Sequence, residues 1–451
     1  MSRIQSLKIS ISGVRGIVGD TLTPQLLASF AGAFGTYVGR GPILIGRDTR
    51  RSGEMVRNAV IAGLLSAGCE PVDLGIVPVP SIQIRTAQTH ARGGIAITAS
   101  HNPVEWNALK FINPQGLFLN SHQAAELLDI YHQGVFTQVP SAEIMRVRSD
   151  DGAISGHIER LCGYFNRDQV RKARLKVVLD ACNGAGSLAA PRFLRELGCR
   201  VIEIHTKPDG IFPRNPEPIP ENLALLSQAV VKHGADVGFA QDADADRLAV
   251  IDHLGNPIGE DYSLVLACLF VLERLKGVVV TNLSATRAVD DLAGAFNCPV
   301  IRTKIGEINV VEEMIQRAAV VGGEGNGGVI LPAIHHCRDS MGGMGAVLQL
   351  MAQRASPLRE IVNQLPRYVM LKDKVQISQD RVPALQEKMK TRFAGASFDT
   401  LDGLKLAWAD AWLHVRPSNT EPILRLVAEA RSRKRALALV RDTKKIAATL
   451  R

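Results

Sequence analysis

The chain has 451 residues, of which 46% are hydrophobic and 5% aromatic, and its formal net charge is +9. One hydrophobic core does not organise so long a chain, so we expect about two to four globular domains. The positive charge suits anionic ligands, but the basic residues are spread out and aromatic stacking platforms are few, so we expect no nucleic-acid binding.

Short apolar runs alternate with amphipathic segments of roughly 10–15 residues, which is the pattern of parallel α/β units. We expect strands at 42–45, 94–98, 175–179, 236–240 and 277–281, and helices at 24–37, 54–66, 222–232 and 261–275. The longest apolar stretch, near residues 264–272, is too short to span a bilayer, so we expect no membrane association.

Ser100 ends one of these apolar runs, at the carboxyl end of a predicted strand, where open α/β sheets bind their ligands. A serine hydroxyl is a weak nucleophile until a base or a metal activates it, and His101, Lys110 and Mg²⁺ are the nearest candidates. The alternative is a helix N-cap serine followed by an Asn-Pro turn. A Ser-His-Asp hydrolase fits poorly, because neighbouring Ser and His side chains diverge from an extended backbone and no Gly-x-Ser-x-Gly elbow occurs.

Three aspartates, Asp242, Asp244 and Asp246, follow the predicted strand at 236–240. A curled loop can aim all three the same way, and carboxylates crowded together repel one another unless a cation lies between them. An EF-hand is excluded, because its sixth and twelfth positions would be Arg247 and His253. The choice is therefore between a Mg²⁺ site and a solvated acidic turn.

Two further loops carry polar groups suited to a phosphorylated sugar. The glycine-rich run 322–328 contains Glu324 and Asn326, which can hydrogen-bond to vicinal hydroxyls, although a flexible loop is the alternative. The second loop offers guanidinium, hydroxyl and amide groups for a phosphate dianion, unless it is a plain turn between strands. Its residues are Arg416, Ser418, Asn419 and Thr420, with Arg425 just beyond.

In their order along the chain these four loops resemble the phosphoserine, metal, sugar and phosphate loops of the α-D-phosphohexomutase family. The resemblance extends to residues 45–53, 178–186 and 208–218 and so covers essentially the whole chain. It implies an α/β fold with three similar mixed α/β domains plus a smaller C-terminal α+β domain around a central cleft. A polar interval at 134–152 and turns at 253–257 and 364–366 allow that division. The expected domains are 1–152 with the phosphoserine loop, 153–254 with the metal loop, 255–365 with the sugar loop and 366–451 with the phosphate loop.

The resemblance implies that phosphorylated Ser100 passes its phosphate to the free C1 or C6 hydroxyl of a hexose monophosphate. A bisphosphate forms and reorients, and the opposite phosphate returns to Ser100, with a hexose 1,6-bisphosphate as activator. Ser100, Asp242, Asp244 and Asp246 are then the Mg²⁺ ligands. His101 and Lys110 are the acid-base candidates, Arg15 is catalytic, and the substrate-binding residues are Arg247, Lys304, Glu324, Asn326, Arg416, Ser418, Asn419, Thr420 and Arg425.

The sugar loop narrows the choice of substrate. Asn326 stands where familiar members carry serine, and an amide can hydrogen-bond to a C2 substituent, so glucosamine phosphate is the first choice. Glucose or mannose phosphate is the alternative, and a phosphosugar phosphatase or binding protein that lost the relay is a more distant one. Gly306-Glu307 and Gly328 stand where some members have histidine, so Lys110 and His101 become the stronger candidates for the acid-base residue.

The seven cysteines are odd in number and scattered, without Cys-x-x-Cys pairs, which favours free thiols in the cytoplasm. We expect a monomer or homodimer whose partner is a small phosphosugar.

Overall fold

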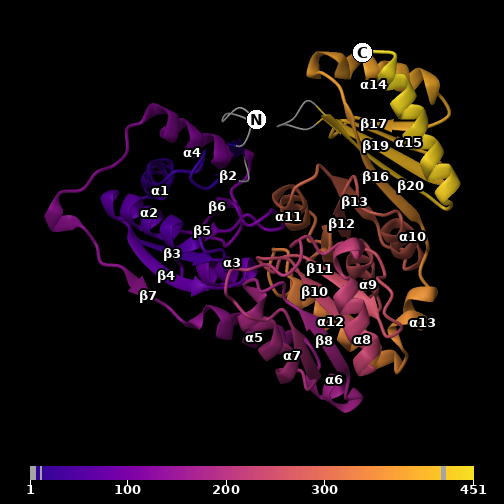
Figure 1. Ribbon diagram of the computed structural model, residues 1–451, viewed down its shortest axis with the longest axis horizontal. Coiled ribbons are helices and arrows are strands. Elements are labelled where there is room, and N and C mark those ends of the chain that lie inside the picture. The colour runs from indigo at the N-terminus through magenta and orange to yellow at the C-terminus, as the bar shows by residue number, and fades with distance from the viewer. Residues whose placement is uncertain (1–6, 11–12, 418–422, 451) are drawn as a thin grey trace. The chain divides into compact units, whose positions relative to one another are not determined.

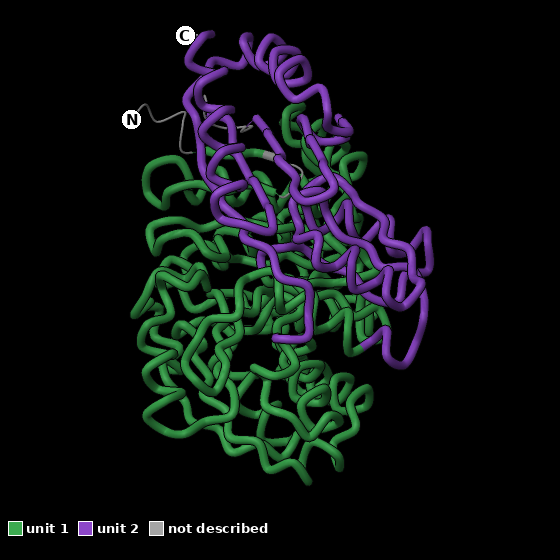
Figure 2. Tube along the Cα trace, turned by 90° about the vertical axis from the view of Figure 1, so that its right-hand side faces the viewer, with its two compact units in different colours: residues 1–270, 327–362 green, residues 271–326, 363–451 purple. Residues whose placement is uncertain are grey.

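The computed structural model describes residues 7–10, 13–417 and 423–450 (Figure 1). The chain forms two compact units, coloured green and purple in Figure 2. The first unit comprises residues 1–270 and 327–362, and the second comprises 271–326 and 363–451. The chain therefore enters each unit twice.

The N-terminal part of unit 1 contains a mixed sheet with the order β1-β2-β6-β5-β3-β4-β7. Its strands are β1 (Lys8–Ser10), β2 (Gly13–Ile17), β3 (Pro42–Arg47), β4 (Glu70–Ile76), β5 (Gly93–Ile97), β6 (Trp106–Ile112) and β7 (Arg148–Ser149). Its helices are α1 (Pro24–Val38), α2 (Gly53–Ser66), α3 (Val79–Gln88) and α4 (Ser121–Gln133). Because β3 runs parallel to β4 and β5, the loops that follow β3 and β5 leave the sheet at the same edge.

Helix α1 begins at a favourable capping sequence. The Thr23 side chain accepts a hydrogen bond from Leu26 N, and Pro24 lacks only an N–H group that would have no helical partner in the first turn. Its buried face carries Phe30 and Phe34, which pack with α2, α4 and the sheet in one hydrophobic core. Close approach of α1 and α2 depends on Gly63, because a Cβ there would lie 2.3 Å from the Ala28 carbonyl oxygen.

A second sheet in unit 1 has the order β11-β10-β8-β9. Its strands are β8 (Lys176–Asp180), β9 (Arg200–Ile204), β10 (Val237–Gln241) and β11 (Leu248–Asp252). The helices are α5 (Gly152–Tyr164), α6 (Arg167–Ala173), α7 (Gly186–Glu196) and α8 (Ala224–His233), and the returning segment 327–362 adds β15 (Gly328–Ile330) and α12 (Ser340–Arg354). Strands β8, β9 and β10 are parallel and β11 is antiparallel, so the loop between β10 and β11 lies at the carboxyl end of β10.

Unit 2 contains a parallel group, β13-β12-β14, and an antiparallel sheet of order β16-β20-β19-β18-β17. The first comprises β12 (Val279–Asn282), β13 (Val300–Thr303) and β14 (Val321–Glu324), with helices α10 (Ala288–Ala295) and α11 (Glu307–Gln316). The second comprises β16 (Val369–Gln376), β17 (Ser397–Asp399), β18 (Leu404–Ala407), β19 (Ala411–Pro417) and β20 (Ile423–Ala430), with α14 (Val382–Arg392) and α15 (Arg433–Ala448). Helices α9 (Tyr262–Leu272) and α13 (Leu358–Asn363) cross from one unit to the other.

The expected strands and helices are present, with ends displaced by a few residues. Three parallel-rich sheets with helices and an antiparallel C-terminal sheet confirm the predicted fold class. The interval 134–152 is less featureless than its composition indicated, because a short 3₁₀ turn (Ser141–Glu143) precedes β7, and β7 pairs with β4.

Two expectations about composition were also tested. All seven cysteines are free, as expected. Among the described residues, no helix has both the length and the apolarity needed to cross a bilayer.

Gly63→Ala should destabilise unit 1 by about 1–3 kcal/mol, because the added methyl overpacks the contact between α1 and α2. Gly163→Ala is the matched control, since the same methyl meets nothing within 4 Å on α5 and should leave stability equal or higher. Scanning calorimetry of both variants tests this, and equal melting temperatures would show that the two helices adjust freely.

Candidate active site

Ser100 lies in the loop after β5 in a left-handed conformation, with φ of 49°. Its Oγ donates a hydrogen bond to Asp242 Oδ2 at 2.6 Å and lies 3.3 Å from His101 Nδ1. The expected divergence of the Ser100 and His101 side chains is therefore wrong, because it assumed an extended backbone and the positive φ turns the two side chains together. One carboxylate and one imidazole contact the hydroxyl.

A buried arginine holds the Ser100 loop in this conformation. Arg50 donates hydrogen bonds of 2.7–2.8 Å to the carbonyl oxygens of Ser100, Asn102 and Pro103. Its Nε donates to Asp48 Oδ2 at 3.0 Å, and the buried pair occupies the end of β3. Sequence reasoning assigned no role to Arg50, although charged residues directly after an apolar strand were the available signal.

The three aspartates lie in the loop between β10 and β11, where each is buried. A carboxylate oxygen from each lies within 4.8 Å of those of the other two, so the side chains converge as their spacing predicted. The loop curls at Ala245, whose φ is 61°, and the backbone N–H groups of Asp246 and Arg247 both donate to Asp242 Oδ1 at 3.2 Å.

Two cations each hold one oxygen of a neighbouring aspartate. Lys110 Nζ donates to Asp244 Oδ2 at 2.8 Å, and Arg338 Nη2 donates to Asp246 Oδ2 at 2.5 Å. The other oxygens, Asp244 Oδ1 and Asp246 Oδ1, are buried and have no hydrogen-bond partner in the part of the chain that the structure describes. Because a buried acceptor needs a partner, two oxygens that accept no hydrogen bond in an all-oxygen cluster fit a hard divalent cation such as Mg²⁺.

The charges of the cluster are uneven. Burial, reinforced by Asp244 and Asp246, raises the pKa of Asp242 well above its ordinary value. Burial also acts to raise the pKa of Asp244, but Lys110, a hydrogen bond with Asp242 and the charge of Arg338 together leave that pKa below its ordinary value. Burial and the two neighbouring carboxylates therefore disfavour a negative charge on Asp242, the residue that accepts from Ser100, and a cation bound beside it would favour that charge.

His101 is neutral in this environment, because burial, followed by the positive charges of Arg247 and Arg15, lowers its pKa to about 2. Arg15 is held nearby by a 2.6 Å hydrogen bond from its Nη1 to Asn102 Oδ1, and Arg247 Nε lies 3.9 Å from Asp246 Oδ1. Arg15, His101, Lys110 and Arg247 thus lie around Ser100 and the aspartates, all within unit 1.

The segment before α12 supports the metal loop and was not identified from sequence. Besides the contact of Arg338 with Asp246, the Ser340 hydroxyl donates to the Ala245 carbonyl oxygen at 2.6 Å and so holds the strained residue. Asp339 caps α12 through Met341 N and lies 3.0 Å from His157 Nε2. The available signal in the sequence was a polar Arg-Asp-Ser triplet at the start of an apolar helical segment.

Unit 2 contains the predicted sugar loop. Glu324 is buried at the end of β14, where its Oε1 accepts from Asn282 Nδ2 at 2.9 Å and from Gly306 N at 3.0 Å. Asn326 is half-buried and Lys304 is exposed. The carboxylate is thus fixed in position by one of its oxygens.

The predicted phosphate loop is described in part. Arg416 and Arg425 are directly opposite each other on antiparallel strands β19 and β20, so two guanidinium groups flank this end of the sheet. Arg416 Nε donates to Asp402 Oδ1 at 2.9 Å, and Arg425 is exposed. Ser418, Asn419 and Thr420 lie outside the described residues.

Four profiles of the phosphoglucomutase/phosphomannomutase family match the chain in succession. They are α/β/α domain I over residues 7–138, domain II over 155–255, domain III over 259–368 and the C-terminal domain over 369–446. A Thermococcus kodakarensis protein named phosphoglucomutase/phosphomannomutase is 39% identical over 437 residues, and the match covers 94% of each chain. A Methanopyrus kandleri protein named "Probable phosphoglucosamine mutase" is 36% identical over 432 residues, covering 95% of each chain. The solved structure of a phosphoglucomutase/phosphomannomutase family protein from Burkholderia thailandensis superimposes with a TM-score of 0.85 at 27% identity, covering 100% of this chain and 98% of that one.

Asp242→Asn should weaken Mg²⁺ binding by at least about tenfold while leaving the metal-free protein as stable or more so, because the amide removes a buried like charge. The expected readouts are a melting temperature that Mg²⁺ no longer raises and a lost heat of Mg²⁺ binding in titration calorimetry.

Asp252→Asn is the control for Asp242→Asn. Asp252 is also buried, but it pairs with Arg359 Nη1 at 2.9 Å, outside the cluster. This variant should lose stability and keep its response to Mg²⁺. A full Mg²⁺ response in Asp242→Asn would exclude the cluster as the metal site.

Proposed function

Because the chain belongs to the phosphoglucomutase/phosphomannomutase family and is a phosphohexomutase, we propose that phosphorylated Ser100 transfers the phosphoryl group between C1 and C6 of a hexose monophosphate. The observation that carries the proposal is the 2.6 Å hydrogen bond between Ser100 Oγ and Asp242 in the buried cluster. A hydroxyl in contact with a metal-type carboxylate site suits phosphoryl transfer, whereas it has no use in a simple helix cap.

Asp242, Asp244, Asp246 and an oxygen of Ser100 are the proposed ligands of Mg²⁺. When bound, Mg²⁺ supplies positive charge that stabilises the transferring phosphoryl group. The chain itself orients the proposed ligands. Lys110 holds Asp244 Oδ2, Arg338 holds Asp246 Oδ2, and Arg50 holds the loop that carries Ser100.

Proton transfer and charge compensation fall to the residues around Ser100. The attacking sugar hydroxyl must lose a proton, and His101 and Lys110 are the proposed acceptors. His101 is the neutral one and lies 3.3 Å from Ser100 Oγ, whereas Lys110 is ion-paired with Asp244. Arg15 and Arg247 are proposed to offset the negative charge of the phosphoryl group.

Unit 2 is proposed to recognise the sugar and the second phosphate. Glu324 and Asn326 are proposed to hydrogen-bond to the sugar hydroxyls. Lys304 is proposed as a further substrate-binding residue, as the resemblance to the family implies. Arg416 and Arg425, with Ser418, Asn419 and Thr420, are proposed to hold the phosphate that is not transferred. A relay through a bisphosphate needs a second phosphate site, because the sugar carries a phosphate at each end before it reorients. A hexose 1,6-bisphosphate is the proposed activator.

Glucosamine phosphate is the proposed substrate, with glucose or mannose phosphate as the alternative. The support is the amide of Asn326, which can both donate to and accept from a C2 substituent. Relatives of similar identity are named for both activities, so the names do not rank the two. We also propose that the chain divides into four domains, with boundaries after residues 152, 254 and 365. The free cysteines support a cytoplasmic location.

Ser100→Ala should lower turnover at least about a thousandfold, because no other hydroxyl replaces the phosphate carrier. The assay is ³¹P NMR with Mg²⁺, a trace of hexose 1,6-bisphosphate and, in separate samples, the 1-phosphates of glucosamine, glucose and mannose. Wild-type protein should produce a 6-phosphate signal without inorganic phosphate.

Ser187→Ala serves as the control for Ser100→Ala, since the buried Ser187 Oγ has no hydrogen-bond partner among the described residues and the residue lies on α7. It should retain activity. Turnover that survives Ser100→Ala would disprove the phosphoserine relay, and release of inorganic phosphate alone would identify a phosphatase.

Asn326→Ser should lower the preference for glucosamine phosphate over glucose phosphate by roughly tenfold, because the hydroxyl loses one of the two amide contacts to C2. The measurement is the ratio of kcat/KM for the two sugars. Asn58→Ser, on the exposed face of α2, should leave that ratio unchanged. An unchanged ratio in Asn326→Ser would remove Asn326 from substrate choice.

A further inference from the structure

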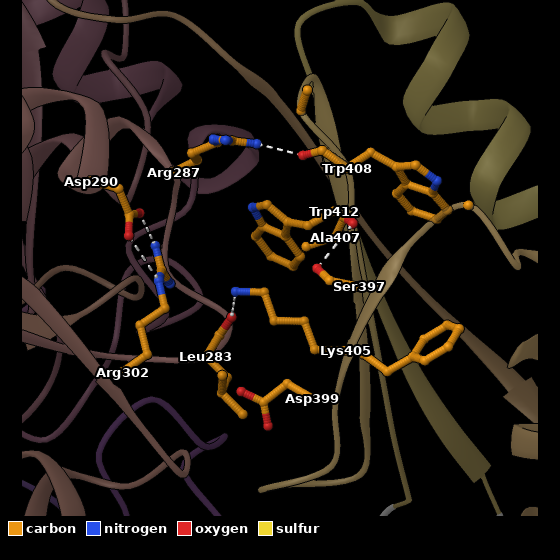
Figure 3. Close-up of a pocket in the computed structure, with 13 residues that line it drawn as sticks. Leu283, Arg287, Asp290, Arg302, Ser397, Asp399, Lys405, Ala407, Trp408 and Trp412 are labelled. Atoms are coloured by element: carbon orange, nitrogen blue, oxygen red, sulfur yellow. Dashed lines mark hydrogen bonds and ion pairs between the residues drawn. The ribbon is translucent and has the colours of Figure 1, made fainter.

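Unit 2 contains a cavity of about 700 Å³ that neither the transfer chemistry nor the proposed sugar loop uses. It lies between the region around α10 and strands β17, β18 and β19, and Figure 3 shows the side chains that line it. Its volume falls within the range of about 300–1,000 Å³ that is common for small-molecule sites.

Strand alternation places polar groups on the cavity side of the antiparallel sheet. Leu404 and Leu406 of β18 face the hydrophobic core of this sheet, so Lys405 and Ala407 face the opposite side. Ala407 is opposite Trp412 on β19, and Lys405 is opposite Asp399 on β17. The cavity wall is therefore an indole, a lysine and a carboxylate in neighbouring positions.

Lys405 is the unusual member of this wall, because its charge is buried without an ionic partner. The residue is 8% exposed, its Nζ donates to the Leu283 carbonyl oxygen at 2.6 Å, and the Nζ lies 4.6 Å from the centre of the Trp412 ring. Within the described residues it forms no ion pair with a carboxylate. Burial, followed by the charge of Arg302, lowers the pKa of Lys405 well below its ordinary value. Asp290, Glu429 and Asp399 act in the opposite direction but do not offset burial. The surroundings therefore disfavour the ammonium form of Lys405, and an anion bound beside Nζ would stabilise it.

Each of the two carboxylates that line the cavity accepts a hydrogen bond from a group other than Lys405. Asp399 Oδ1 accepts from Leu401 N at 2.8 Å, and Asp290 is paired with Arg302. Three cations (Arg287, Arg302 and Lys405) and two carboxylates (Asp290 and Asp399) line the cavity, so three minus two leaves a net charge of +1.

We propose that this cavity binds a small aromatic carboxylate, whose carboxylate group pairs with Lys405 and whose ring lies against Trp412, Leu283 and Ala407. The single ammonium of Lys405 favours a ligand with one negative charge. The apolar side chains beside it favour a flat aromatic ring. A phosphate dianion fits less well, because every N–H of the Arg302 guanidinium is already bonded to Asp290 or to a backbone carbonyl oxygen. Arg287 Nη1 donates to the Trp408 carbonyl oxygen, and its Nε lies 3.9 Å from Asp291 Oδ1.

The test is titration calorimetry of the wild-type protein, with Mg²⁺ present, against 2-naphthoate. The neutral isostere 2-naphthamide has the same ring without the charge. Saturable binding of 2-naphthoate, at least about tenfold tighter than that of 2-naphthamide, is expected. Equal binding of the two probes, or no saturable binding of 2-naphthoate, would overturn the proposal.

Three variants locate the site. Lys405→Met should weaken 2-naphthoate binding at least about tenfold, whereas Lys388→Met, an exposed lysine on α14, should leave it unchanged. Asp399→Asn should tighten binding severalfold, because it removes the negative charge opposite Lys405. Asp399 is exposed, so this variant gives an answer even where Lys405→Met does not fold.

The outcomes separate this site from the mutase site. Binding that Ser100→Ala abolishes and Lys405→Met preserves would place 2-naphthoate at the transfer site and overturn the proposal. Glucose 6-phosphate that binds in a Lys405-dependent manner and displaces 2-naphthoate would identify a phosphate pocket instead. These tests measure binding and not turnover, so failure of the cavity proposal can be distinguished from failure of the mutase proposal.

Discussion

The mutual repulsion of three buried carboxylates is the constraint on which the active centre depends. Asp242, Asp244 and Asp246 lie at the end of one buried strand, where water screens their charges poorly. Lys110 donates to one oxygen of Asp244 and Arg338 to one oxygen of Asp246, while burial and these two carboxylates raise the pKa of Asp242. A divalent cation would reduce the repulsion and use the two carboxylate oxygens that accept no hydrogen bond among the described residues. Hydroxyl, carboxylates and cation therefore form one coupled electrostatic system.

Backbone strain is the cost of this arrangement, and buried polar contacts offset it. Ser100 and Ala245 both adopt left-handed φ angles that non-glycine residues seldom hold. Arg50 fixes the first through the carbonyl oxygens of its loop, and Ser340 fixes the second through the Ala245 carbonyl oxygen. Such fixed loops suit catalysis, because groups already in position need no reorganisation when the phosphoryl group moves.

Unit 2 contains two buried charged side chains whose surroundings differ. Glu324 is buried and held by Asn282 and Gly306, so it presents a fixed acceptor. Lys405 is buried, its Nζ donates to a carbonyl oxygen and lies over an indole ring, and among the described residues it forms no ion pair. The first pattern holds a carboxylate in one position, which is what the proposed sugar recognition requires, and the second fits the anion site proposed above.

The sequence alone identified Ser100, the three aspartates, the Glu324 loop and the Arg416 loop, because each follows an apolar strand and carries chemistry that a short motif displays. It also determined the fold class, since the alternation of strands and helices is a local pattern. Only the tertiary structure decided that Arg338, 92 positions from Asp246, supports the metal loop, and that Arg50 supports Ser100. It likewise decided that Ser100 and His101 point together, and that Lys405 lies in a cavity. The physical reason is that strand ends are encoded by neighbouring residues, whereas pairing, strain and burial arise only when distant segments pack.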